Sequence, residues 1–290
     1  MTTADTTNAE GRTDVAFAPL DGERRVAYAE YGVPEGSPVV FLHGTPGSRL
    51  LGELLDDAAC ERGLRLLAPD RPGYGRSSPW PSRTLSDTGA LLDAVLDDAG
   101  VERAGVVGFS GGGPHALAAA ATREERVAGV DVISGAAPPG VRDAPPVPLR
   151  VAEALAARTP RLLRAVVGAQ RRLAKRASPE TIAAQYTTPE SRTELPDDVA
   201  GLLKRDFLEA LSDPHGFVTE SRLLAQPWDV PLSDIEIPVQ FWHGERDGNA
   251  SPGATRTLAD RIPDASFALF DGEDHVGALL RSRSRALERD

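Results

Sequence analysis

The chain has 290 residues, of which 41% are hydrophobic and 26% are charged, proportions typical of a soluble globular protein. Its formal net charge of −11 argues against nucleic acid as a partner, and the lack of an apolar run of about 18 residues argues against a membrane span. The polar stretch 1–14 has no apolar signal core, so it predicts a flexible tail and a cytoplasmic protein. The single cysteine, Cys60, cannot form an internal disulfide, and we expect it to be a small buried hydrophobe.

The first half of the chain alternates short apolar runs with longer helical patterns. The expected strands are 15–18, 25–29, 38–42, 64–68, 104–107 and 127–133, and the helical patterns cover about 49–62, 85–99 and 114–120. Strand-like runs return at 238–242 and 266–270, with a helix at about 252–262 between them and a final helix starting near Val276. Continuous apolar strands that alternate with helices predict an α/β fold, a mostly parallel sheet with helices on both faces.

Residues 137–230 break this alternation, because they contain proline-punctuated helical segments and no convincing strand. We therefore predict a helical cap (137–230) inserted into a core domain made of 15–136 and 231–290. Charge supports the division, since the cap carries a net charge of +1 and the remainder −12.

One segment of the cap, residues 158–176, holds seven basic residues and no acidic one. Apolar residues stand at near-helical spacing within it: Leu162, Leu163, Val166, Val167 and Leu173. This pattern predicts either a lid helix that faces an anion or a membrane, or a cap helix packed by its apolar face with solvated arginines opposite. We favour the second interpretation, because charged stripes on surface helices usually reflect solvation.

The pentapeptide Gly108-Phe109-Ser110-Gly111-Gly112 reads G-x-S-x-G between an expected strand and an expected helix. A strand that turns sharply into a helix forces its turn residue into strained backbone angles and leaves little room for flanking side chains. Glycine on both sides meets that demand. We therefore predict that Ser110 is an exposed nucleophile.

A serine nucleophile needs a base and a group that orients the base. Among the five histidines, His275 follows the last expected strand in a loop at a helix start, and we take it as the base. Asp247, in the loop after the preceding strand, is our choice for the orienting acid. Glu245 is the alternative, whereas Asp274 adjoins His275 and should point away from its ring.

The oxyanion of a tetrahedral intermediate needs two preorganised amide donors. We expect the Gly111 amide, at the start of the elbow helix, to supply one of them. The second should come from the loop after Leu42, and we expect the Thr45 amide to supply it. Gly44 and Gly47 allow that loop to approach closely.

These motifs together resemble the α/β-hydrolase fold family. His43-Gly44-Thr45-Pro46-Gly47-Ser48, Asp70-Arg71-Pro72-Gly73-Tyr74-Gly75-Arg76-Ser77, the Ser110 elbow, Asp247 and His275 occur in the order of that family. The resemblance covers the chain from about residue 15 to its end. It implies an eight-stranded, mostly parallel sheet with a helical cap after the sixth strand. Within the family, residues 70–77 and the loop that begins at His43 are similar to those of esterases and proline iminopeptidases.

The expected function is a cofactor-independent, metal-free serine hydrolase that acts on small carboxylic esters. Four aromatic side chains are candidates for an apolar substrate pocket, although those of the cap could instead pack the cap itself: Phe109, Phe207, Phe217 and Trp228. The sequence leaves open whether the chain forms a homodimer.

Three alternatives remain. An aminopeptidase of the proline iminopeptidase type would need an acidic cap residue to bind the substrate's amino group, and Glu153, Glu209 or Glu220 could serve. A ligand-binding sensor on a hydrolase scaffold is a second alternative, against which the complete set of three catalytic residues counts. Lyase or C–C bond hydrolase chemistry on the same residues is a third.

Overall fold

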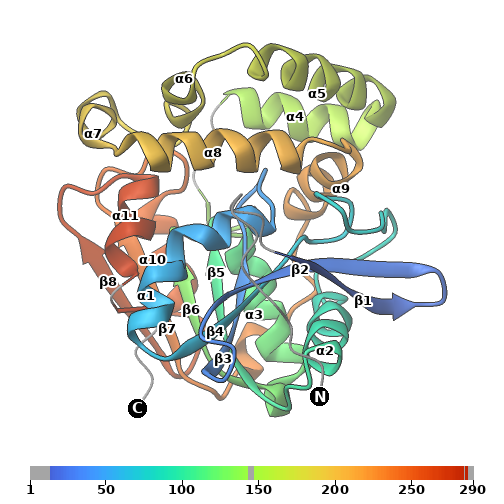
Figure 1. The fold of residues 1–290 in the computed structure, drawn as a ribbon, viewed down its shortest axis with the longest axis vertical. Helices are drawn as coiled ribbons and strands as arrows, with labels where there is room; N and C mark the ends of the chain where they lie inside the picture. The colour runs from blue at the N-terminus through green and yellow to red at the C-terminus, as the bar shows by residue number, and fades with distance from the viewer. Residues whose placement is uncertain (1–13, 143–146, 284, 287–290) are drawn as a thin grey trace, which may run out of the picture.

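The computed structural model describes residues 14–142, 147–283 and 285–286, and it contains one eight-stranded sheet (Figure 1). The strand order is β1-β2-β4-β3-β5-β6-β7-β8. The β1–β2 and β2–β4 pairs are antiparallel and all other pairs are parallel, which confirms the predicted fold class. The strands are β1 Val15–Asp21, β2 Arg24–Gly32, β3 Ser37–Leu42, β4 Leu64–Pro69, β5 Ala104–Phe109, β6 Val127–Ile133, β7 Val239–Gly244 and β8 Ala265–Phe270. Except for Asp14, the predicted tail 1–14 lies outside the described residues.

Helices cover both faces of the sheet, and each face has its own apolar cluster. One cluster joins the sheet to α2 (Thr88–Asp98), α3 (Gly112–Thr122) and α10 (Pro252–Ala259). The other joins it to the 3-10 helix η1 (Arg49–Leu55), α1 (Asp56–Glu61) and α11 (His275–Ser282). Short 3-10 turns also occur at η2 (Glu124–Arg126) and η3 (Leu232–Asp234). No helix among 14–142, 147–283 and 285–286 is long and apolar enough to cross a membrane.

The continuous apolar strands divide their side chains between these two clusters. In β3, Val40 and Leu42 belong to the first cluster, and Val39 and Phe41 belong to the second. Successive strand residues point to opposite faces, so a strand buried on both sides must be apolar at every position. This is why the central strands could be located from sequence.

The expected helix 49–62 is divided into η1 and α1, and the prediction for Cys60 is wrong. Cys60 is exposed near the end of α1, where Ala59 occupies the buried position. Neighbouring helical positions point about 100° apart, so the side chain of Cys60 can lie in solvent while that of Ala59 is buried.

In the described part of the chain, six α-helices follow β6 and precede β7, and we call them the inserted helices. They are α4 Val147–Arg158, α5 Pro160–Ala174, α6 Pro179–Ala183, α7 Pro189–Glu194, α8 Asp197–Ala210 and α9 His215–Leu224. In Figure 1 they lie above one end of the sheet, with α8 running across it. The boundaries 137–230 for a separate cap domain stay a prediction.

Buried polar contacts hold α8 against the loop that follows β3. Asp206 accepts hydrogen bonds from the amide and hydroxyl of Ser48 at 2.8 and 2.7 Å. Arg49 Nη1 lies 2.8 Å from an Asp70 carboxylate oxygen and 2.6 Å from a Glu209 carboxylate oxygen. The inserted helices therefore dock on the carboxyl end of the sheet, where the elbow and its neighbouring loops also lie.

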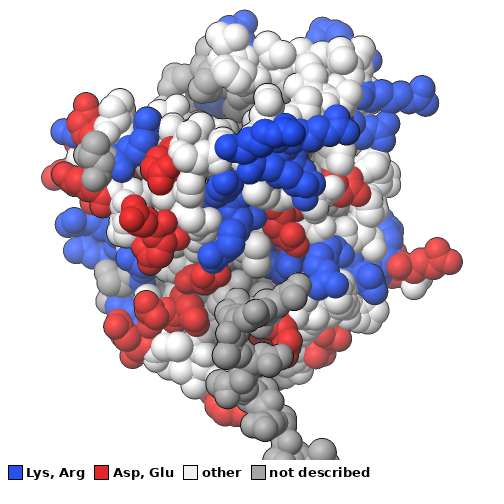
Figure 2. Space-filling view, turned by 45° about the horizontal axis from the view of Figure 1, so that its top comes forward, with Lys and Arg blue, Asp and Glu red and all other residues white. Residues whose placement is uncertain are grey.

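The arginine-rich helix α5 is only half packed. Leu163 and Val167 are buried, but Leu162, Val166 and Leu173 are 52%, 46% and 69% exposed. The expectation of one packed apolar face is thus only partly met, because α5 buries Leu163 and Val167 but leaves their neighbours Leu162 and Val166 largely in solvent. Figure 2, with its top turned forward, shows uncharged surface and blue basic side chains over this upper part of the molecule.

Candidate active site

Ser110 stands on a strained turn between β5 and α3. Its φ is +53°, a left-handed value that residues other than glycine rarely adopt. The turn is fixed by its backbone, since the Ser110 amide donates to the Ile133 carbonyl at 2.9 Å and the Ser110 carbonyl accepts from Gly113 at 3.0 Å. The fold therefore holds a strained serine in place, as is common at functional sites.

Glycine is required on both sides of Ser110. A Cβ atom on Gly108 would lie 2.6 Å from the Gly112 carbonyl oxygen, and one on Gly112 would lie 2.0 Å from the Leu42 carbonyl oxygen. Both distances are too short for real atoms. The two glycines thus let β3, β5 and α3 meet around the serine, which is the steric reason for the G-x-S-x-G pattern.

The structure brings His275 and Asp247 together. His275 Nδ1 lies 2.7 Å from Asp247 Oδ2, and both side chains are buried. The imidazole also packs against Phe109, the residue before Ser110, with 4.8 Å between ring centroids. Within the described part of the chain, no hydrogen bond joins the Ser110 hydroxyl to this imidazole. Such contacts are often long in ligand-free enzymes and tighten when substrate binds.

Asp247 is surrounded by hydrogen-bond donors. Its Oδ1 accepts from the amides of Asn249 and Ala250 at 2.8 and 3.0 Å, and its Oδ2 lies 3.2 Å from His243 Nε2. Burial by itself would raise the pKa of this carboxyl, but the charge of His275 and the hydrogen bonds from His243 and His275 hold the pKa well below its usual range. Asp247 is therefore ionised at neutral pH and can fix the ring of His275.

The other two carboxylates near His275 have different partners. Glu245 accepts from the Gly272 amide at 3.0 Å. Asp274 caps α11 by accepting from the Gly277 amide at 2.9 Å, and it also accepts from the Thr188 amide at 2.7 Å. Asp247 is thus the carboxylate that contacts the His275 ring, and its role as the orienting acid stays a prediction.

The loop after β3 lies against the elbow. A Cβ atom on Gly111 would lie 2.2 Å from Thr45 Oγ1 and 3.4 Å from the Thr45 amide nitrogen. A Cβ atom on Gly44 would lie 3.3 Å from Ser110 Cβ. The two backbone amides expected to act as oxyanion donors, those of Thr45 and Gly111, are therefore close neighbours beside Ser110.

The four aromatic candidates for a substrate pocket are not gathered around Ser110. Phe109 is next to it and contacts His275. Phe207 is 2% exposed inside an apolar cluster of the inserted helices, and Phe217 packs against the same cluster. Trp228 lines a surface hollow together with residues 82–85 and Arg222, and none of the predicted catalytic residues lines that hollow. A substrate contact by these side chains stays a prediction.

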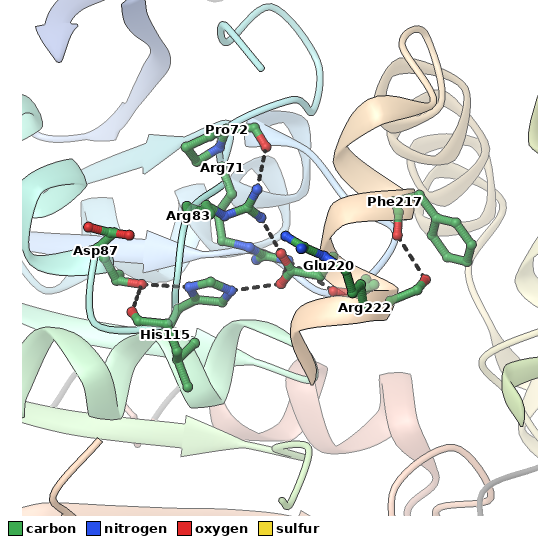
Figure 3. A network of polar contacts seen from close by, with 12 residues as sticks. Arg71, Pro72, Arg83, Asp87, His115, Phe217, Glu220 and Arg222 are labelled. Carbon is green, nitrogen blue, oxygen red and sulfur yellow. Dashed lines mark hydrogen bonds and ion pairs between the residues drawn. The ribbon is translucent and has the colours of Figure 1, made fainter. Parts of the chain in front are cut away.

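A buried polar cluster behind the loop was not foreseen from sequence. Figure 3 shows Glu220 of α9 between Arg83 and His115, close to Arg71. Burial, aided by the charge of Arg71, lowers the pKa of His43, which accepts a hydrogen bond at Nε2 from the Arg71 amide at 3.0 Å. In the described ranges, no three His, Cys, Asp or Glu side chains are grouped as metal ligands would be.

Comparison with known proteins supports the resemblance noted from the motifs. The chain is 33% identical over 99 residues to an uncharacterised hydrolase, YcgS, of Bacillus subtilis (strain 168), a match that covers 34% of each chain. It is 34% identical over 115 residues to a proline iminopeptidase of Neisseria gonorrhoeae, covering 37% of this chain and 35% of that one. These matches thus span about a third of the relatives' own length.

The fold also matches solved structures over nearly its whole length. A thermophilic esterase from Thermogutta terrifontis superimposes with a TM-score of 0.69 at 21% identity, covering 94% of this chain and 93% of that one. At this identity the likeness concerns the fold alone. A family model described as the alpha/beta hydrolase fold matches residues 37–281, so this chain belongs to the α/β-hydrolase fold family.

Proposed function

We propose that this chain is a cofactor-independent serine hydrolase that cleaves small carboxylic esters. The observation that carries the proposal is the 2.7 Å contact between His275 Nδ1 and Asp247, made beside a strained serine on a strand-to-helix turn. A serine hydroxyl is a weak nucleophile at neutral pH and needs a base of this kind. Membership of the α/β-hydrolase fold family supports the same assignment.

In the proposed reaction, Ser110 Oγ attacks the ester carbonyl carbon while His275 Nε2 accepts the serine proton. Asp247 holds Nδ1–H of the imidazole and stabilises the imidazolium that forms. The imidazolium then donates its proton to the leaving alcohol, which leaves an acyl group on Ser110. Water, deprotonated by His275, releases the acid by the same steps in reverse.

We assign the stabilisation of the tetrahedral oxyanion to the amides of Thr45 and Gly111. Their closeness to each other and to Ser110 supports this assignment. Amide donors that are already aimed before the reaction need no reorganisation as negative charge develops, and each is worth about 10²–10³ in rate.

The proposal is tested with Ser110→Ala and a fluorophosphonate probe. We expect the wild-type protein to hydrolyse short p-nitrophenyl esters and to be labelled at Ser110, and the variant to lose both properties while it keeps its circular dichroism spectrum. Ser233→Ala, at an exposed serine of η3, is the matched control and should behave as wild type. Ester turnover that survives Ser110→Ala would refute the mechanism.

The three glutamates considered for binding a substrate amino group are all paired with arginine. Glu153 lies 2.7 Å from Arg142, and Glu209 lies 2.6 Å from Arg49. Glu220 is fully buried among its own cationic partners. Glu153 and Glu220 therefore already have counter-charges, whereas Glu209 shares Arg49 with Asp70; the pairing of Glu153 and Glu220 argues against these two as ligands for a substrate amino group. Turnover of proline p-nitroanilide faster than that of simple esters would reverse this preference.

A further inference from the structure

Arg71 lies directly behind the loop that carries the proposed oxyanion donor. It follows β4, its side chain is fully buried, and its guanidinium donates to three consecutive residues of the loop. Nη1 donates to the His43 carbonyl, and Nη2 lies 3.1 Å from the Gly44 carbonyl oxygen and 3.0 Å from Thr45 Oγ1. A rigid guanidinium with several donors can hold such a set of acceptors in one arrangement.

The Gly44 carbonyl accepts from Arg71 Nη2 at 3.1 Å and from His43 Nδ1 at 2.8 Å, and these two hydrogen bonds fix the direction of the Thr45 amide. The peptide bond between Gly44 and Thr45 is trans, unlike the cis bond between Thr45 and Pro46. In a trans peptide the carbonyl and the N–H point in opposite directions. Because the Gly44 carbonyl points to Arg71, the Thr45 N–H points away from Arg71. A charged donor on the carbonyl also polarises the peptide and makes its N–H a stronger donor.

Arg71 is in turn held by an inserted helix. Its Nη2 lies 3.2 Å from Glu220 Oε1 on α9, and both side chains are fully buried. Arg83 donates to the other oxygen of Glu220, and His115 Nε2 lies 2.7 Å from Oε1 (Figure 3). The start of α9 also rests on the turn that carries Arg71, since the Gly216 amide donates to the Gly73 carbonyl at 2.9 Å.

We propose that Arg71 is a positioning residue of the oxyanion hole and that Glu220 makes its position depend on how α9 is seated. The chain of contacts runs from α9 through Glu220 and Arg71 to the Gly44–Thr45 peptide. Docking of the inserted helices and aiming of the oxyanion donor are thus one structural event. The inference rests on the proposed function, because the role of the Thr45 amide belongs to that proposal.

The cluster contains its own control. Arg83 contacts Glu220 and the Pro72 carbonyl, at 3.1 Å, but none of its described contacts is with residues 43–45. If the cluster only stabilises the fold, loss of Arg83 and loss of Arg71 should have the same effect on kcat per correctly folded site. If Arg71 aims the amide, only its loss, or the loss of Glu220 that holds it, should change the chemical step.

The variants are Glu220→Gln, Arg71→Lys, Arg71→Met and, as the control, Arg83→Met. The stoichiometry of fluorophosphonate labelling counts the correctly folded sites, so kcat is expressed per labelled site. We expect kcat to fall by about 10²-fold in Arg71→Met, the low end of the effect of losing one oxyanion donor, with KM changed less than threefold. Arg71→Lys keeps the positive charge but loses the forked set of guanidinium donors, so its kcat should lie between those of Arg71→Met and wild type. The kcat of Glu220→Gln should lie in the same range. Arg83→Met should keep kcat within about threefold of wild type, far less than the loss of an oxyanion donor, because Arg83 does not contact residues 43–45.

A second measurement does not depend on turnover. The Thr45 amide resonance in a ¹⁵N-labelled protein should shift in Arg71→Met and Glu220→Gln and stay in place in Arg83→Met. Equal kcat per labelled site in all variants, with an unmoved Thr45 resonance, would overturn the inference while leaving the proposed function intact. A wild-type protein that neither hydrolyses esters nor is labelled at Ser110 would overturn the proposed function, and the inference with it.

Discussion

Replacing Asp206 by asparagine is expected to stabilise this protein above pH 7. Asp206 lies on the buried side of α8, is 4% exposed, and accepts hydrogen bonds from the amide and hydroxyl of Ser48. Burial, together with the charges of Asp70 and Glu209, outweighs those hydrogen bonds and raises the pKa of Asp206 to about 7. The ionised carboxylate therefore costs the folded state free energy that an amide would not.

The sign and size of the effect follow from proton linkage. An unfolded aspartate has a pKa of about 3.9, so between about pH 4 and 7 the folded state binds a proton that the unfolded state does not. The free energy of unfolding then falls as the pH rises through this window. A difference of about 3 pKa units corresponds to about 4 kcal/mol at pH 8, an upper bound because water entry and relaxation reduce it. In the Asp206→Asn variant, the buried amide nitrogen would have no hydrogen-bond acceptor, which reduces the stabilisation by about 1–3 kcal/mol.

The assay is urea denaturation of wild type and Asp206→Asn from pH 5 to pH 8. We expect the variant to be more stable at pH 8 by about 1–3 kcal/mol and its advantage to shrink by about 2–3 kcal/mol at pH 5. Asp198→Asn, at an exposed position of the same helix, is the control and should not alter the pH dependence in this range. The reasoning would be refuted if the difference in the free energy of unfolding between Asp206→Asn and wild type were the same at every pH.

Further predictions concern the proposed catalytic groups and the inserted helices. Asp247→Asn should lower kcat for p-nitrophenyl esters by about 10⁴-fold, whereas Glu245→Gln should leave it unchanged; the reverse result would exchange their roles. Gly111→Ala should lower kcat by about 10²–10³-fold, since its Cβ would displace Thr45, and wild-type kcat would contradict the oxyanion assignment. Phe207→Ala should cost about 3–5 kcal/mol in denaturant titrations without changing acyl-chain preference, and a changed preference would instead place Phe207 in the substrate pocket.

Steric and periodic constraints made much of the core readable from sequence. Gly108 and Gly112 are required because a Cβ atom at either position would clash with backbone atoms. The requirement is therefore visible in the five consecutive residues 108–112. The central strands are apolar at every position because both of their faces are covered. These are local demands, so a local pattern reveals them.

The buried polar contacts near the loop that follows β3 left no such pattern. Glu220 meets His115 across 105 positions of sequence, and Asp206 meets Ser48 across 158. A glutamate in a helix reads as a surface residue until the packing of that helix is known. For this reason Glu220 was considered as a ligand for a substrate amino group, whereas its carboxylate is buried between arginines.

The sequence by itself determined the sheet and the glycine-flanked turn at Ser110, because each depends on neighbours along the chain or on a fixed strand-and-helix alternation. Only the tertiary structure decided which side chains of the inserted helices pack and which stay exposed, as the contrast of Leu163 with Leu162 illustrates. It also decided that Asp247 is the acid that contacts His275 and that Arg71 donates a hydrogen bond to the Thr45 side chain. The physical reason is that burial and ion pairing depend on the three-dimensional neighbours of a residue, and residues distant in sequence supply most of them.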